Sequence, residues 1–275
     1  MTDPESPPVE SHVVRNVVQG VLILLVVAAV IIAALVVVTH DHAAAPHAAA
    51  GGTATPKNMA SDGVLLTGND GTITAVRTPA VAIGHPVPTD NSAHAGTVRI
   101  VEYIDYACPV CQSFEATNLS STATLVASGA ATLEIHPVSI LDRTSLGTRY
   151  SSRGANAAAC VANFDPDAFL NVTATLYQYQ PAEATKGLTN AQILSLLGKA
   201  GVTGPAVTKC VTNETYRDWV TSTTTAVEDG TFQHVSTTPA QFDGTPTVFV
   251  NGTEYTGPVN DAAAFGEFVA AQAAG

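Results

Sequence analysis

Basic residues are scarce in this chain, and the scarcity excludes one class of partner. The 275 residues include 11 lysines and arginines against 23 aspartates and glutamates, which gives a formal net charge of −12 at pH 7. A protein that binds a phosphate backbone needs a basic surface to neutralise it. We therefore expect no nucleic-acid partner.

Cysteine is scarce as well, because the sequence has only four, and only Cys108 and Cys111 are close together. Such a pair is half of a common zinc site, but structural zinc normally takes four ligands. The sequence offers no second pair of this spacing and no close pair of a cysteine and a histidine. His40, His42 and His47 fall in an alanine-rich stretch that is more simply interpreted as solvated linker. We expect no metal and no cofactor.

A long apolar run occurs once, at residues 17–38, where Gln19 is the only polar side chain. As an α-helix, a run of this length spans the roughly 30 Å hydrocarbon core of a bilayer. Arg15 precedes the run and the next basic residue is Lys57, so the charge bias favours an N-terminus inside the cell and a domain outside it. A cleaved signal peptide is the alternative, but its apolar core usually has about 7 to 15 residues, and it would export the domain equally.

The regions on either side of this run differ in composition. Residues 1–16 are polar and contain three prolines, as expected of a short cytoplasmic tail. Residues 39–61 are rich in Ala, Gly, Thr and Pro and predict a flexible linker. We expect the folded domain at residues 62–275, held at the cell membrane by a single-pass helix and lying outside the cytoplasm.

Turn signals and hydrophobic periodicity predict an α/β domain in this region. Two hairpins are expected, one around Asn69-Asp70-Gly71 and one around Asn251-Gly252. The order strand, helix, strand, helical block and hairpin, followed by a last helix, indicates a sheet with helices packed on it. The predicted strands are 64–67, 72–78, 97–106, 132–140, 247–250 and 253–255. One predicted helix starts at the cysteine pair, a second includes residues 155–162, and four more begin at Asp165, Thr189, Asn213 and Asn260. The helical block is expected at about residues 145–230.

The cysteine pair comes directly after the predicted strand 97–106, and Pro109 stands where the first residue of a helix would. Free N–H groups and the helix dipole at such an end favour thiolate over thiol, so the pKa of Cys108 is expected to be low. A stabilised thiolate also makes the disulfide of the pair a stronger oxidant. We predict Cys108 as the nucleophile and Cys111 as the resolving thiol. An inert structural disulfide is the alternative, but it leaves Pro109 unexplained.

Two stretches carry a specific resemblance. VEYIDYACPVCQSFE at residues 101–115 resembles the active site of DsbA-like proteins of the thioredoxin superfamily, and GTPTVFVNG at residues 244–252 resembles their second signature. The resemblance covers about residues 62–275, is of the membrane-anchored actinobacterial type, and implies a thioredoxin-like fold with an inserted helical subdomain. It also implies that Pro246 is cis and that Thr245 contacts both the disulfide and the substrate.

Glu102 lies six residues before Cys108, and the resemblance gives it a role. In thioredoxin-like proteins an acid at this position lies beneath the active site, where it can relay protons to the buried second thiol, and burial would raise its pKa. The alternative for Glu102 is a solvated strand position. Asp105 is left out of the predicted site, because three residues along a strand reverse the direction of a side chain.

Cys160 and Cys210 both fall in the helical block, 50 positions apart. We predict a structural disulfide between them, since disulfides persist outside the cytoplasm. A second redox relay or two free thiols are the alternatives, but neither cysteine has a partner at i+3.

Together these features predict an extracytoplasmic thiol:disulfide oxidoreductase that oxidises cysteine pairs of exported proteins. The resemblance implies re-oxidation by a membrane partner similar to DsbB or to vitamin K epoxide reductase. The resemblance leaves a second hypothesis open, since Val110 and Thr245 differ from the residues of many strong oxidases: a disulfide reductase or isomerase that is kept reduced across the membrane and acts on misoxidised exported proteins. A non-catalytic binding or metal-delivery module on the same fold is the third hypothesis.

Overall fold

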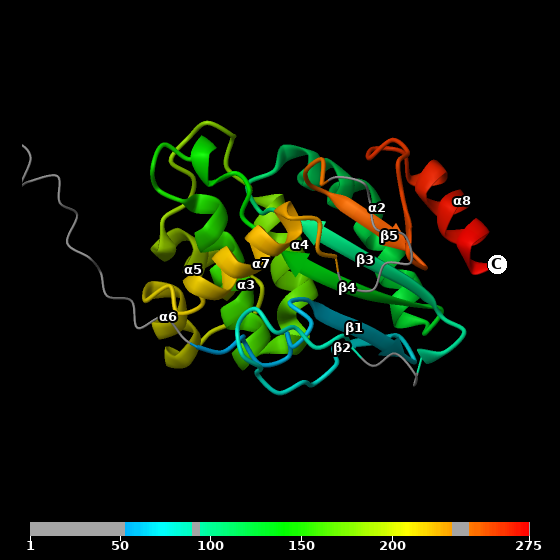
Figure 1. Ribbon diagram of the computed structural model, residues 1–275, viewed down its shortest axis with the longest axis horizontal. Helices are drawn as coiled ribbons and strands as arrows, with labels where there is room; N and C mark the ends of the chain where they lie inside the picture. Colours follow the sequence, from blue (N-terminus) through cyan, green and yellow to red (C-terminus); the bar gives the residue numbers. More distant parts are fainter. Residues whose placement is uncertain (1–52, 90–93, 233–241, 275) are drawn as a thin grey trace, which may run out of the picture. The chain divides into compact units, whose positions relative to one another are not determined.

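The computed structural model describes residues 53–89, 94–232 and 242–274, in which a mixed sheet has the strand order β2-β1-β4-β3-β5-β6 (Figure 1). Its strands are β1 (Val64–Asn69), β2 (Thr72–Ala75), β3 (Val98–Ile104), β4 (Ala131–Pro137), β5 (Thr247–Val250) and β6 (Thr253–Glu254). The α-helices are α2 (Pro109–Ala127), α3 (Tyr150–Phe164), α4 (Phe169–Gln178), α5 (Asn190–Lys199), α6 (Pro205–Thr212), α7 (Arg217–Glu228) and α8 (Ala262–Ala273). Two 3₁₀ turns are η2 (Asp142–Thr144) and η3 (Pro166–Ala168).

Both predicted hairpins are present. In the first, β1 pairs with β2 around Asp70 and Gly71, whose φ angles are 51° and 84°. In the second, β5 pairs with β6 around Asn251 and Gly252, with φ angles of 48° and 81°. Two consecutive residues with positive φ make the tight turn whose twist suits a hairpin, which explains why Asp-Gly and Asn-Gly signalled both turns in the sequence.

Strand β3 lies in the middle of the sheet, parallel to β4 and antiparallel to β5. Its side chains alternate between two buried faces. Ile100 and Ile104 join the main core, to which α2 and α8 contribute, whereas Val101 and Tyr103 join a second cluster on the other face, to which α7 contributes. By the same alternation Glu102 lies on the face that α2 covers.

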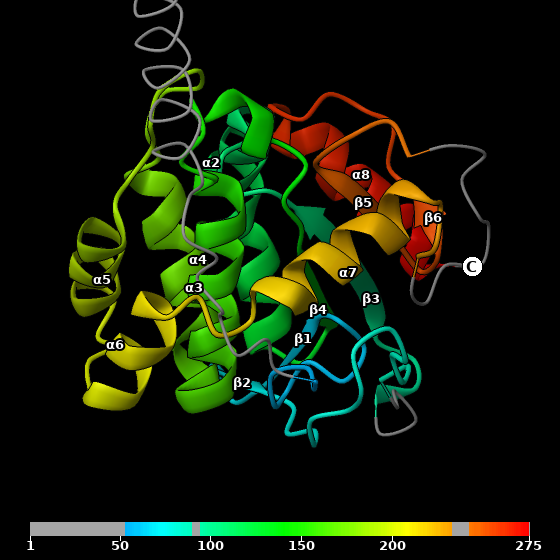
Figure 2. The same ribbon diagram turned by 60° about the vertical axis from the view of Figure 1, so that its left-hand side comes forward.

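Helices α3 to α7 stand between β4 and β5 in the chain, where the helical block was predicted. Helix α3 is its centre, in contact with α4, α6 and α7 (Figure 2). Residues 155–162 of α3 are buried throughout, and alanines dominate among them. Small side chains on every face let the neighbouring helices approach closely, so an alanine-rich helix suits this central position.

The folded domain begins before residue 62, so the predicted end of the linker is wrong. Ala54 forms a β-bridge with Ala82, and Met59 is fully buried. The Asn58 side-chain amide donates a hydrogen bond to the Ala162 carbonyl at 2.8 Å. These contacts are made largely through backbone and polar groups, which is why the composition of residues 54–61 resembles that of a linker.

The prediction that a helix begins at Asn213 is also wrong. Asn213 follows the last residue of α6, and the next helix, α7, begins at Arg217. Helix α6 begins earlier, where Gly204 with a φ of 131° leads into Pro205 at the first helical position. Asn suits the residue after a helix as well as the residue before one, and the sequence alone did not distinguish the two.

Two other predicted helix starts can be compared with the observed caps. Thr189 is the N-cap of α5, where a helix start was predicted, and the structure shows that it forms a complete capping box with Gln192. At α8 the predicted cap Asn260 is wrong by one residue, because Asp261 Oδ1 accepts hydrogen bonds from the backbone N–H groups of Ala263 and Ala264, each at 3.0 Å. Asn and Asp are both good N-cap residues. Which of two neighbouring residues becomes the N-cap depends on the direction in which the backbone enters the helix.

The predicted transmembrane helix at residues 17–38 lies outside the described residues, as do the tail at residues 1–16 and most of the linker. Among the helices that the structure describes, none combines the length and the apolar character needed to cross a bilayer. The anchor therefore stays a prediction from the sequence.

Candidate active site

Cys108 occupies the N-cap of α2, directly after the loop that leaves β3. Its backbone N–H donates to the Asp105 carbonyl at 2.9 Å, which fixes the turn between strand and helix. Pro109 is the first helical residue, where its missing N–H costs nothing. The Cys108 sulfur accepts a hydrogen bond from the Cys111 backbone N–H at 3.4 Å. The sulfur thus faces the unpaired N–H groups at the helix start, as the sequence predicted.

These contacts lower the pKa of Cys108 from its ordinary value of 9.0 to about 6. The largest cause is hydrogen bonding with the Cys111 thiol, with smaller contributions from Thr245 and from the backbone N–H groups of Cys111 and Val110. Burial of Cys108 acts in the opposite direction. The favourable contacts prevail, so Cys108 is mostly thiolate at neutral pH.

Cys111 differs strongly from Cys108. Its side chain is fully buried, and burial raises its pKa well above the ordinary value. The neighbouring Cys108 raises it further, because a second negative charge beside a thiolate is unfavourable. Neither cysteine forms a disulfide in this structure, so the pair is reduced. One sulfur is therefore suited to nucleophilic attack, and the other stays protonated until a neighbouring group takes its proton.

The lowered pKa of Cys108 predicts how its reactivity depends on pH. Because only the thiolate reacts with an alkylating agent, the alkylation rate of Cys108 should rise with pH to a plateau, with a midpoint near pH 6. Iodoacetamide labelling of the reduced protein between pH 4 and 10, quantified by mass spectrometry, measures this curve. A rate that still rises above pH 8 would show that Cys108 is an ordinary thiol.

The Thr245-Pro246 peptide bond is cis, and its loop lies against the cysteine pair. The antiparallel pairing of β5 with β3, in which Tyr103 faces Thr247, brings this loop to the end of β3 where Cys108 follows. The Cys108 sulfur lies 3.2 Å from the Thr245 carbonyl oxygen. The structure thus brings together four predicted site residues from two distant parts of the chain.

Glu102 is buried, with 1% of its surface exposed, so the solvated alternative is wrong. Burial raises the pKa of Glu102 well above its usual range, and the neighbouring carboxyl group of Glu115 raises it further. Glu115 belongs to α2, one turn after Cys111, and burial raises its own pKa to about 7. The sequence analysis did not single out Glu115, although its i+4 spacing from Cys111 places the two on one helix face.

Asp105, which was left out of the predicted site, lies in the turn before Cys108. Strand β3 ends at Ile104, so the alternation of side chains does not extend to Asp105. Its buried carboxylate accepts hydrogen bonds from the backbone N–H groups of Ala107 and Leu141 and from the Ser151 hydroxyl, at 2.8, 3.0 and 2.5 Å. Burial outweighs these contacts and raises the pKa of Asp105 to about 7. Asp105 therefore holds the turn before Cys108 in place.

The helical block also holds the active-site turn. Gln180, just after α4, donates hydrogen bonds to the carbonyls of Tyr106 and Cys108 at 2.9 and 3.0 Å. Tyr177 on α4 donates its hydroxyl hydrogen to the Asp105 carbonyl at 3.1 Å and accepts at its own carbonyl from the Gln112 side chain at 2.7 Å. These contacts join residues about 70 positions apart, so no local sequence pattern could have indicated them.

Cys160 and Cys210 form a disulfide that joins α3 to α6, with a Cα to Cα distance of 5.8 Å. Both side chains are buried, and neither lies at a helix N-terminus. The geometry agrees with the predicted structural role rather than with a second redox relay.

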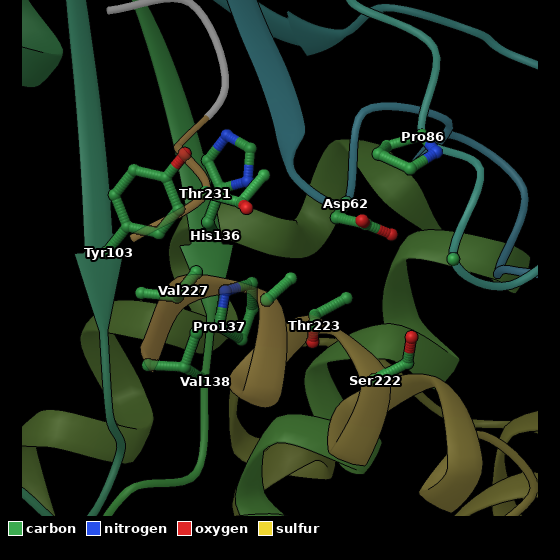
Figure 3. A pocket seen from close by; sticks show the side chains of 12 residues that line it. Asp62, Pro86, Tyr103, His136, Pro137, Val138, Ser222, Thr223, Val227 and Thr231 are labelled. Atoms are coloured by element: carbon green, nitrogen blue, oxygen red, sulfur yellow. The ribbon is translucent and has the colours of Figure 1, made fainter. Parts of the chain in front are cut away.

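A separate pocket of about 210 Å³ lies between β4 and α7 (Figure 3). Figure 3 shows Asp62, His136 and Ser222 in its lining. Asp62 Oδ1 accepts a hydrogen bond from the Trp219 indole at 2.8 Å, and His136 stacks on Tyr103 with 4.5 Å between the ring centroids. Neither cysteine lines this pocket. In the described part of the chain, no three histidine, cysteine or acidic side chains are grouped as metal ligands.

Comparisons with known proteins agree with this site. The sequence model of the Thioredoxin family matches residues 92–270, whereas no curated protein sequence matches the chain. Among solved structures, reduced disulfide bond oxidoreductase DsbG of Mycobacterium tuberculosis is 31% identical over 76% of this chain and 86% of its own, with a TM-score of 0.56. Reduced DsbA of the same organism is 27% identical over 77% of this chain and 99% of its own, with a TM-score of 0.53.

The family match covers more than half of the chain, so the chain belongs to the thioredoxin family. Within that family it is a DsbA-like thiol-disulfide oxidoreductase, similar to proteins of actinobacteria. The predicted thioredoxin-like α/β fold and the predicted enzyme class are confirmed.

Proposed function

We propose that this protein oxidises cysteine pairs of exported proteins by donating a disulfide between Cys108 and Cys111. The observation that carries the proposal is the pKa of Cys108, which is lowered to about 6. At pH 7 the reduced protein is stabilised by a thiolate that the disulfide form lacks. Electrons therefore pass more readily from a substrate dithiol to this disulfide.

The proposed oxidation of a substrate has two exchange steps, and Cys108, Cys111 and Glu102 have the roles that these steps require. A substrate thiolate attacks the Cys108 sulfur, a mixed disulfide forms, and Cys111 leaves and takes up a proton. A second substrate thiolate then attacks the first substrate sulfur, which forms the substrate disulfide and releases the Cys108 thiolate. Two electrons pass from the substrate to the cysteine pair, and Glu102 is proposed to supply the proton that Cys111 needs.

The surface around Cys108 favours an extended peptide as substrate. Val110 is 46% exposed next to Cys108, which gives an apolar contact for a chain that crosses the site. The Thr245 carbonyl oxygen lies 3.2 Å from the Cys108 sulfur, and Pro246, which follows it, is partly exposed. We propose that the substrate backbone pairs with this loop, since an extended segment beside a sheet can bind through its backbone groups.

The apolar run in the sequence supports a proposed location, and the family resemblance supports a proposed redox partner. We propose that residues 17–38 anchor the protein in the cell membrane, with the domain outside the cytoplasm. The partner that re-oxidises Cys108 and Cys111 would be a membrane protein similar to DsbB or to vitamin K epoxide reductase. An anchored domain would meet such a partner at high effective concentration.

The alternative is a reductase or isomerase that is kept reduced across the membrane. Thr245, next to the cysteine pair, favours this alternative, because a threonine before the cis-proline resembles the isomerase and reductase relatives rather than the strong oxidases. The chemistry at Cys108 is the same in both cases, and only the reduction potential differs.

Reaction with a reduced, unfolded protein tests the direction. Full-length protein, oxidised beforehand, should form disulfides in an equimolar reduced substrate within minutes, and equilibration with glutathione should give a reduction potential above about −200 mV. Substrate oxidation by ambient oxygen, measured without the protein, is the control. A potential near the thioredoxin value of about −270 mV would refute the oxidase proposal and support the reductase.

A further inference from the structure

The pocket between β4 and α7 is separate from the cysteine pair and has a buried floor below an exposed rim. Tyr103 and His136 lie on the floor, with 1% and 2% of their surfaces exposed. Gly84 and Thr231 belong to the rim. The volume of about 210 Å³ is smaller than the roughly 300 to 1,000 Å³ of sites for drug-sized ligands. A compound about the size of one substituted ring therefore suits this pocket.

The walls of the pocket are mostly apolar. Apolar side chains come from the loop before β3, from the end of β4 and from α7, and they are Pro86, Pro137, Val138, Ala226 and Val227. Figure 3 shows Val138 and Val227 on one side of the pocket and Asp62 on the other. Contact with such walls removes apolar ligand surface from water, which favours binding of a ligand with an apolar body.

Asp62 is the only acidic side chain in the lining, and one of its oxygens has no protein donor. Its Oδ1 accepts the hydrogen bond from the Trp219 indole at 2.8 Å, but no described residue donates one to Oδ2. No described basic side chain forms an ion pair with Asp62. Burial raises the pKa of the Asp62 carboxyl group, because its charged form has lost water. A cation in the pocket would compensate for that loss.

His136 is the only basic side chain in the lining, and it pairs with a different acid. Its Nε2 lies 3.5 Å from Glu134 Oε1, and its ring stacks on Tyr103. These contacts hold the imidazole at the floor and leave the Asp62 carboxylate without a counter-charge. Because no lysine or arginine lines the pocket, an anionic ligand would meet a carboxylate and no fixed positive charge.

We propose that this pocket binds a small organic cation with an apolar body, such as an arylalkylamine or an amidine, whose charged group pairs with Asp62. The apolar body lies against Val138 and Val227. The hydroxyl groups of Ser222 and Thr231, which also line the pocket, accept hydrogen bonds from the remaining N–H groups of the ligand. Neither Cys108 nor Cys111 takes part, so the site adds a binding function to thiol-disulfide exchange.

Benzamidine is a suitable probe, because it joins a planar cation to a single aromatic ring. Trp219 is the only tryptophan of the chain, and its indole N–H is bonded to Asp62, so its signal in a proton–nitrogen correlation NMR spectrum reports on the pocket. Titration of full-length protein in a non-ionic detergent should shift this signal to saturation, with a dissociation constant of about 1 mM or below. Benzamide, which has the same shape and no charge, should bind at least about 10-fold more weakly.

Asp62→Asn is the decisive variant, since asparagine keeps an oxygen for the Trp219 indole and removes the charge. It should weaken benzamidine at least about 10-fold and leave the binding of benzamide unchanged. Ala226→Leu, which fills the pocket from α7, should weaken both compounds. Asp70→Asn makes the same charge change in an exposed hairpin turn, where Asn serves as well as Asp, and should bind benzamidine like the wild type. All three variants should retain disulfide exchange, which shows that they fold.

The proposal is overturned if benzamidine gives no saturable shift of the Trp219 signal, or if wild type and Asp62→Asn bind it equally. Tighter binding of benzoate than of benzamidine would also overturn it, because the pocket would then select anions. None of these results would affect the proposed oxidation of exported proteins, which is tested separately at Cys108.

Discussion

Replacing Cys108 with serine should reduce thiol-disulfide exchange by at least about 1000-fold, to the rate of the uncatalysed reaction. A serine hydroxyl remains protonated in conditions where the Cys108 thiol, with its pKa of about 6, is ionised. Cys111 cannot substitute, because its sulfur is buried and its pKa is raised well above the usual range. Oxidation of a reduced, unfolded protein measures the effect.

Cys111→Ser is the matched variant, and its expected result is different. It keeps the Cys108 nucleophile but has no thiol to resolve a mixed disulfide. When it is mixed with a substrate that carries a disulfide, the Cys108 thiolate attacks that bond, one substrate sulfur leaves as a thiolate, and the covalent complex should accumulate on non-reducing gels. The double variant Cys108→Ser with Cys111→Ser should form none. Equal trapping by the two single variants would contradict the assigned roles, and normal exchange by Cys108→Ser would support a binding module instead.

The second large effect is expected at the other cysteine pair. Replacing both Cys160 and Cys210 with alanine should lower the free energy of unfolding by about 2 to 5 kcal/mol, because the disulfide closes a loop of 50 residues and joins α3 to α6. Denaturation with urea, followed by the fluorescence of the buried Trp219, measures this change. Cys108 and Cys111 remain, so exchange activity should persist below the unfolding temperature.

The same double variant distinguishes a structural role of the Cys160–Cys210 disulfide from a role as a redox relay. If Cys160 and Cys210 passed electrons to the active site, their removal would stop turnover while the free energy of unfolding changed little. Treating wild-type protein with a reductant strong enough to open the buried bridge should reproduce the stability loss of the variant. An unchanged urea midpoint in both cases would contradict the structural role.

The parts of the site that are continuous in sequence could be predicted. Cys108, Pro109 and Cys111 stand on one helical turn, and their position after a strand is visible in the residue pattern. The Thr245-Pro246 loop was assigned by resemblance, and β5 pairing with β3 then brought it to the cysteines. Turn residues with positive φ likewise marked both hairpins, since few other residues adopt that conformation.

Contacts between distant segments could not be predicted. Gln180 reaches the Cys108 carbonyl only because α4 ends beside the active-site turn. The role of Asp105 in the turn was not predicted, because a strand pattern does not show where the strand ends. Glu115 could be predicted only in part. The sequence shows its spacing from Cys111, but its interaction with Glu102 depends on how α2 packs on β3. The helix after α6 was misplaced because Asn213 suits either end of a helix.

The most direct test of the account is to locate the covalent bond made during exchange. Oxidised full-length protein is mixed with a reduced, unfolded substrate, quenched with acid within seconds, digested and analysed by mass spectrometry without reduction. The account predicts that substrate peptides are attached to Cys108, with Cys111 as a free thiol and Cys160 still bonded to Cys210. Attachment at Cys111 or at the second pair, or oxidation of the substrate with no attachment at Cys108, would contradict it.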